Sequence, residues 1–88
     1  MVEETPSLEH MLFEHMVVEG LLTLAELRIK RGVRIPSYML KTITNFSEAY
    51  LCVIRENFPE EMAEHYSLIE KKLDSFLELY ENKQKPLK

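Results

Sequence analysis

PSLEHMLFEHMVVEGLLTLAELRIKRG, residues 6–32, is the segment that decides the fold of this 88-residue chain. Thr5 is a good N-cap, Pro6 suits the first helical position, and Gly32 stands where a helix commonly ends. Acid is supplied almost entirely as Glu, a strong helix former, and Asp74 is the single Asp of the chain. We therefore predict a helix over about residues 6–31.

Two further segments carry apolar residues at helical spacing, one over about residues 36–57 and one over about residues 59–82. No segment has the alternating pattern of a strand. Short connections between the three predicted helices require neighbours to run antiparallel. We predict an all-α, antiparallel three-helix (up-down-up) bundle as one domain over residues 6–82. Residues 1–5 and the basic tail, 83–88, are expected to be flexible.

The first predicted helix has apolar residues on two opposite sides, as its positions at about 100° per residue show. One stripe is formed by Leu8, Met11, Val18, Leu22, Ala25 and Ile29. The other stripe is formed by Phe13, Val17, Gly20, Leu24 and Leu27. A helix in a three-helix bundle needs one broad apolar face. The second stripe therefore indicates either a homodimer, in which Gly20 lets two backbones approach, or a first helix that the other two wrap more fully.

Composition excludes several classes of protein. The net charge of −4 argues against non-specific nucleic-acid binding as the main task. A single cysteine, Cys52, rules out an internal disulfide and fits a reducing compartment. No apolar run is long enough to span a membrane, and the N-terminus has no secretory signal pattern. We expect a cytoplasmic protein without membrane partners, and the many Glu and Lys with few amides suit a thermophile.

The predicted topology gathers acidic side chains at one end of the bundle. Glutamates that flank the start of the third helix form the centre of this group: Glu56, Glu60, Glu61 and Glu64. Carboxylates and free carbonyls at a helix end are ligands that Ca²⁺ prefers. The alternative is that these glutamates only complement the dipole of the third helix. The sequence has no EF-hand loop, so a calcium site here would be irregular.

A transition-metal site is a second hypothesis for the same end of the bundle. In the up-down-up arrangement His15 and His65 lie at similar heights, with Tyr50 opposite. His10 and His15 are five residues apart and point about 140° away from each other, so one ion cannot bind both within a chain. His15 also lies near an apolar stripe, where a structural histidine is the simpler interpretation. Ca²⁺ is favoured over a transition metal because carboxylates outnumber histidines.

Basic residues gather at the opposite end, around the end of the first helix. Those able to contact phosphates are Arg28, Lys30, Arg31 and Arg34. Cations at a helix C-terminus are also ordinary dipole compensation, and few aromatics accompany them. Nucleic acid is therefore the third-ranked partner.

No arrangement of residues indicates catalysis. Cys52 has no histidine placed to activate it, the serines lack a triad context, and two glycines cannot form a phosphate-binding loop. We predict a non-enzymatic protein–protein interaction or adaptor module with an acidic end and a basic end. Divalent-cation binding at the acidic end is the second hypothesis, and a nucleic-acid accessory role through the basic end is the third.

Overall fold

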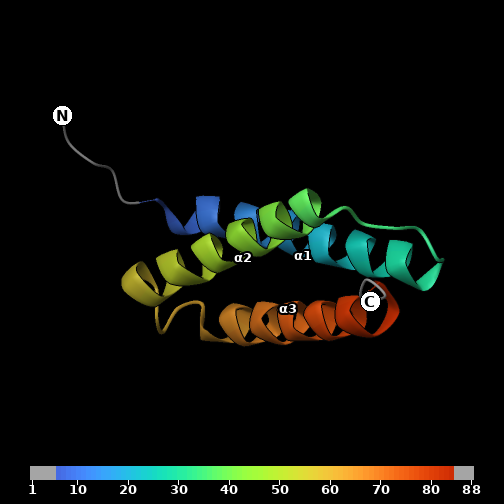
Figure 1. Ribbon diagram of the computed structural model, residues 1–88. Coiled ribbons are helices and arrows are strands. Elements are labelled where there is room, and N and C mark those ends of the chain that lie inside the picture. The colour runs from blue at the N-terminus through green and yellow to red at the C-terminus, as the bar shows by residue number, and fades with distance from the viewer. Residues whose placement is uncertain (1–5, 85–88) are drawn as a thin grey trace.

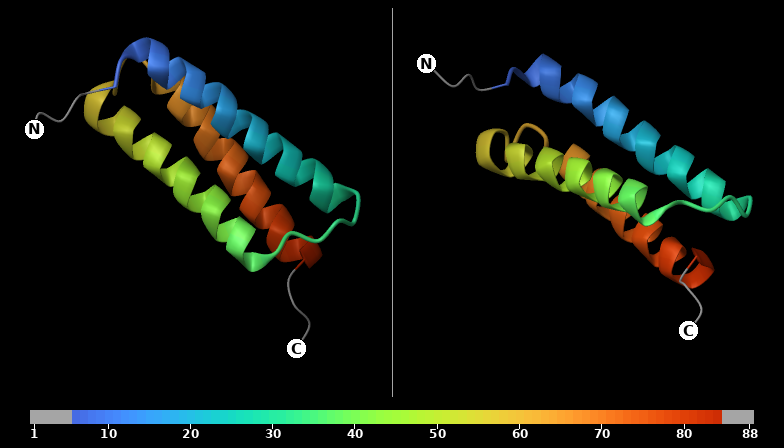
Figure 2. Two further views of the ribbon diagram at one scale, coloured as in Figure 1. Left: turned by 90° about the horizontal axis from the view of Figure 1, so that it is seen from above. Right: turned by 45° about the horizontal axis from the view of Figure 1, so that its top comes forward.

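The computed structural model describes residues 6–84, and these residues form three helices (Figure 1). Helix α1 spans Leu8–Lys30, α2 spans Ser37–Asn57 and α3 spans Ala63–Gln84. Each helix contacts the other two, and α2 runs back along α1 before α3 returns (Figure 2). The predicted all-α three-helix bundle is confirmed. The predicted flexible segment 1–5, with its N-cap Thr5, and residues 85–88 of the predicted tail lie outside the described residues.

Helix α1 begins two residues later than predicted. Ser7, and not Thr5, is the N-cap: its backbone is extended and its hydroxyl accepts a hydrogen bond of 3.0 Å from the amide of His10. This bond satisfies one of the four amide groups that a helix leaves free at its N-terminus. Pro6 therefore precedes the helix instead of occupying its first turn.

The end of α1 follows the prediction for Gly32. Gly32 has φ +84°, the left-handed conformation that glycine adopts without steric cost. Its amide donates to the carbonyl of Ile29 at 3.0 Å, and the amide of Val33 donates to the carbonyl of Arg28 at 2.8 Å. These two bonds form a Schellman motif, which stops the helix and turns the chain toward α2.

The predicted start of the third helix at Pro59 is wrong. Residues 59–62 form turns, and the regular helix begins at Ala63. The Ala63 amide reaches the carbonyl of Glu60 at a long 3.4 Å, whereas the Tyr66 amide donates to the Met62 carbonyl at 2.9 Å. The regular helix therefore starts after Met62, whose own amide donates to the carbonyl of Phe58 at 3.2 Å. The helix also continues to Gln84, so Lys83 belongs to α3 and not to the predicted tail.

The core lies between one face of each helix. Buried side chains from all three helices meet there: Val18, Leu22 and Ile29 of α1, Ile43, Tyr50 and Ile54 of α2, and Ile69, Leu73 and Phe76 of α3. Met62 is fully buried although it precedes α3, which explains why the turn before this helix is held against the bundle. The N-terminus of α1, the C-terminus of α2 and the start of α3 lie at one end (Figure 2). No helix of residues 6–84 is long and apolar enough to cross a membrane.

Candidate functional site

Helix α1 has an apolar face that points away from the rest of the bundle. We call it the outer face, and it is formed by Phe13, Met16, Val17, Gly20, Leu24 and Leu27. Phe13 is 62% exposed, Met16 69% and Leu24 59%, because α2 and α3 both lie on the opposite side of α1 (Figure 2). The interpretation in which the other two helices wrap this side of the first helix therefore fails. No segment within residues 6–84 covers the outer face.

The structure brings all five residues of the predicted interface onto this face. They follow one another at spacings of four and three residues: Phe13, Val17, Gly20, Leu24 and Leu27. This is the alternation by which one helix presents a seam to another helix. Met16 was missed by the sequence analysis, although it lies at helical spacing from Gly20 and is the most exposed apolar side chain of the face.

Gly20 lies in the middle of the outer face and makes it shallowly concave. A Cβ atom built on Gly20 would meet nothing within 4 Å. The surrounding open depression is lined by Met16, Glu19, Gly20, Thr23 and Leu24. An apolar side chain from outside can therefore approach the backbone of α1 closely at this point.

Charge along α1 changes sign from one end to the other. Three of its four glutamates, Glu9, Glu14 and Glu19, lie in its first half, and Glu26 lies in its second half. Arg28 and Lys30 lie in its last turn, and Arg31 is its C-cap. This order complements the helix dipole, whose N-terminus is positive and whose C-terminus is negative. The outer face is thus bordered by acid at one end and by base at the other.

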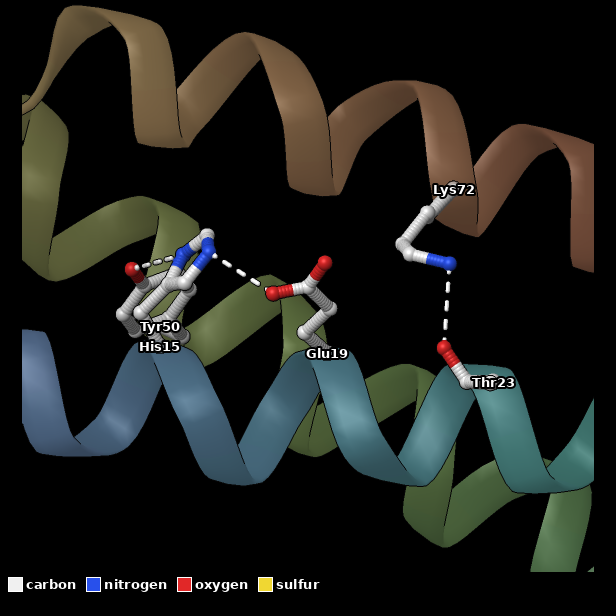
Figure 3. A network of polar contacts seen from close by, with 5 residues as sticks. All are labelled: His15, Glu19, Thr23, Tyr50 and Lys72. Atoms are coloured by element: carbon white, nitrogen blue, oxygen red, sulfur yellow. Dashed lines mark hydrogen bonds and ion pairs between the residues drawn. The ribbon is translucent and has the colours of Figure 1, made fainter.

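The opposite, inner face of α1 contains a buried histidine (Figure 3). His15 is 8% exposed, and its Nδ1 lies 2.9 Å from the hydroxyl of Tyr50. Its Nε2 lies 3.2 Å from a carboxylate oxygen of Glu19. A neutral imidazole that donates from Nε2 to Glu19 and accepts at Nδ1 from Tyr50 satisfies all three groups. His15 is therefore a hydrogen-bonded member of the core.

The surroundings of His15 and Tyr50 hold both groups in their neutral forms. Burial lowers the pKa of His15, and the nearby His65 lowers it further, while Glu19 opposes both effects. Burial also raises the pKa of Tyr50 to about 12, and the carboxylates of Glu14 and Glu19 add to this shift. Both shifts follow from the cost of placing a charge in a poorly solvated position.

The two histidines predicted as metal ligands do lie side by side. The ring centroids of His15 and His65 are 4.7 Å apart, with the rings nearly perpendicular. However, Tyr50 and Glu19 already lie at the two ring nitrogens of His15, and Nδ1 of His65 is buried without a hydrogen-bond partner among the described residues. No group of three His, Cys, Asp or Glu side chains within residues 6–84 is arranged to hold a metal ion.

The glutamates predicted to bind Ca²⁺ all lie on the surface at the acidic end. Glu56 lies in the last turn of α2, and the thiol of Cys52 lies 3.5 Å from the carboxylate of Glu56. Glu60 and Glu61 lie in the turn before α3, and Glu64 lies in its first turn. Exposed acidic residues at these places are those expected of a solvated helix start. The calcium hypothesis stays a prediction from sequence.

The predicted phosphate-contacting residues lie at the opposite end of the bundle. Arg28 and Lys30 end α1, and Arg31 and Arg34 lie in the connection to α2. All four side chains are exposed. Arg28, Lys30 and Arg31 lie at the C-terminal end of α1, and a nucleic-acid contact through these four residues also stays a prediction.

Comparison with known proteins adds no relative: no family model matches this sequence, and no match was found among curated proteins or solved structures. Evidence for the function therefore comes from the geometry and charge of the chain itself.

Proposed function

We propose that this protein is a non-enzymatic protein–protein interaction module whose binding surface is the outer face of α1. The observation that carries the proposal is the exposure of a continuous apolar stripe directly opposite the core. Isolated apolar side chains on a surface are ordinary, but a contiguous patch typically marks an interaction site. On α1 the exposed apolar residues follow one another over nearly the whole helix.

The chemical make-up of the outer face supports this proposal. It contains an aromatic residue, Phe13, and a methionine, Met16, which are both enriched in the centres of protein interfaces. Its own residues from Phe13 to Leu27 are all uncharged, Glu19 lies at the side of its central depression, and charged residues also border it at both ends. An apolar centre with a polar rim is the usual composition of a protein interface.

The buried polar residues support a structural role in place of catalysis. His15, Tyr50 and Glu19 use their polar atoms on one another, as Figure 3 shows. A general base needs a substrate proton within hydrogen-bond reach, and both nitrogens of His15 already lie beside protein groups. The hydrogen bond between His15 and Tyr50 joins α1 to α2.

Site-specific photo-crosslinking tests the proposed function. A photoreactive amino acid at position 24, on the outer face, is compared with the same amino acid at position 68. Leu68 lies on α3 and is 43% exposed, so it is a matched apolar control on another surface. We expect a discrete crosslinked protein product from position 24 in cells, absent from position 68 and lost when Phe13→Glu is added. Equal, diffuse labelling at the two positions would overturn the proposed function.

A further inference from the structure

Resting on the proposed function, we propose that the protein bound by the outer face of α1 is a second copy of the same chain, antiparallel to the first. In this dimer Leu24 of each copy covers Gly20 of the other. The two copies are related by a twofold axis perpendicular to α1. The pair of α1 helices then forms the centre of a six-helix assembly.

The shape of the outer face supports this register. Leu24 projects from it, being 59% exposed, and Gly20 forms a depression one helical turn away. A twofold axis between these positions places each leucine over the glycine of the other copy. The same register puts Val17 opposite Leu27 of the second copy and Phe13 beside Arg31 of the second copy. Val17, Leu24 and Leu27 of the outer face therefore each receive a neighbour from the second copy, as packing of two helices requires.

Charge on one flank of α1 supports the antiparallel direction. Glu14 and Arg28 lie on the same flank of α1, because fourteen residues separate positions only about 40° apart around a helix. In the antiparallel register Glu14 of each copy lies beside Arg28 of the other, which gives two opposite-charge pairs. A parallel pair would instead bring Glu14 of one copy near Glu9 of the other, where like charges repel. On the other flank the same register brings Glu19 of each copy near Glu26 of the other, so the preference for this direction comes from the flank of Glu14 and Arg28.

A second copy also fits better than an unrelated helix. A twofold interface uses the same patch on both partners, so the patch must be complementary to itself. The outer face meets this condition through its projecting leucine beside its glycine, and one flank of α1 meets it through Glu14 and Arg28. An unrelated partner would require neither coincidence.

The oligomeric state of the purified full-length chain is the first test. We expect sedimentation velocity to show a dimer that dissociates on dilution. Leu24→Glu should raise its dissociation constant on the order of a hundredfold or more, since loss of a central buried anchor has such an effect. The matched control Leu68→Glu should remain as dimeric as the unmodified protein. A wild-type monomer at high micromolar concentration would overturn self-association.

Gly20→Leu distinguishes a specific close contact at Gly20 from non-specific hydrophobic association. The variant makes the outer face more apolar, and nothing near Gly20 obstructs the new side chain within one copy. The fold should therefore persist by circular dichroism. Association should nevertheless weaken at least about tenfold, because the added side chain blocks Leu24 of the second copy. Tighter association of this variant would overturn the proposed register.

Charge variants test the direction of pairing. Glu14→Arg and Arg28→Glu should each weaken the dimer on the order of tenfold, because each creates two like-charge pairs. Mixed in equal amounts, the two variants should form a heterodimer, since the cation introduced in one variant then lies beside the carboxylate introduced in the other. Stronger self-association of Glu14→Arg alone would indicate parallel pairing and overturn the proposal.

The two proposals fail in different ways. If position 24 crosslinks in cells to another protein while the purified chain is monomeric, the proposed function stands and the second-copy inference is overturned. If the purified chain is a dimer but Leu24→Glu, Gly20→Leu and the charge variants leave its dissociation constant unchanged, both the outer-face interaction and its partner are overturned. If Leu24→Glu fails to fold, the mixed charge variants decide the question, because Glu14 is only half-buried and Arg28 is exposed.

Discussion

The inner and outer faces of α1 are built from similar residues but have opposite environments. Leu22 on the inner face is fully buried, whereas Leu24, two residues later, is 59% exposed. Their hydrophobicity is the same, so the difference comes only from where α2 and α3 pack. An apolar stripe on a helix therefore identifies a surface that favours burial, but not the molecule that buries it.

The two faces also differ in the polar groups that they contain. The inner face includes His15, whose hydrogen bonds to Tyr50 and Glu19 fix one arrangement of the helices. The outer face is apolar from Phe13 to Leu27. Directional contacts thus specify how α1 sits in its own bundle, while the outer face depends on shape and on the charges at its borders.

The largest expected difference is between Leu22→Ala and Leu24→Ala. Leu22→Ala should lower the free energy of unfolding by roughly 2–5 kcal/mol, since it removes buried methyl groups and leaves a cavity. Leu24→Ala should change it by less than about 0.5 kcal/mol, because a surface substitution loses few contacts. Urea denaturation at a dilution where the monomer prevails measures both values. Equal losses would mean that Leu24 belongs to the core.

Tyr50→Phe should have the next largest effect on the inner face. It keeps the ring but leaves Nδ1 of His15 buried without its partner, which costs about 1–3 kcal/mol. Urea denaturation of the variant measures this loss. As a control, Tyr38→Phe alters a tyrosine that is 71% exposed and should be nearly neutral. An equally small effect of Tyr50→Phe would show that the hydrogen bond to His15 contributes little to stability.

Gly20→Ala should stabilise the monomer by up to about 1 kcal/mol, because alanine is a better helix former than glycine. Nothing within 4 Å opposes the added methyl group. Thermal denaturation of dilute protein measures this gain. Gly32→Ala is the contrasting change, since φ +84° disfavours alanine and the variant should lose stability. A loss of stability with Gly20→Ala would show that the outer face is covered within the chain.

The smallest expected effect is the pH dependence that His15 contributes. Its pKa is lowered in the folded state, so below about pH 6.5 the unfolded chain binds the proton more readily than the folded chain. This contribution to stability is therefore present above pH 6.5 and declines as the pH falls toward the lowered folded-state pKa. Glu19 offsets part of the burial penalty, which keeps the effect small.

The midpoint of urea denaturation, measured from neutral to mildly acidic pH, tests the direction of this change in stability. On acidification the stability of the unmodified chain should decline more steeply than the stability of its His15→Gln variant. The groups that face His15 are Tyr50 of α2, His65 of α3 and Glu19 of α1 itself, so all three stay unchanged in the comparison. A steeper decline for His15→Gln would contradict the assigned direction of the pKa.

Most of the fold could be predicted from local patterns. Gly32 marks the end of α1 because a Schellman motif requires a left-handed residue at that position. The start of α3 could not be predicted in the same way. Pro59 with the glutamates after it resembles a helix start, but Met62 is buried in the core and the regular helix begins only at Ala63. Burial of one side chain outweighed the local preference.

In the candidate site, too, local spacing predicted some features and tertiary packing decided others. The spacing of Phe13, Val17, Gly20, Leu24 and Leu27 predicted a seam on one side of α1, since helical geometry fixes which residues share a face. Whether that seam was internal or exposed depended on the positions of α2 and α3. The contact between His15 and His65 likewise depended on tertiary structure, because fifty residues separate them in the chain.

The sequence by itself determined three helices, their antiparallel order, and the two apolar stripes of α1, because propensity, capping and helical periodicity act over a few neighbouring residues. Only the tertiary structure decided that the stripe of Leu22 is the core and that the stripe of Leu24 faces outward. Two stripes of similar hydrophobicity give no local signal to distinguish them. The choice is made by long-range packing, in which Tyr50 of α2 bonds to His15 and Lys72 of α3 donates a hydrogen bond to Thr23.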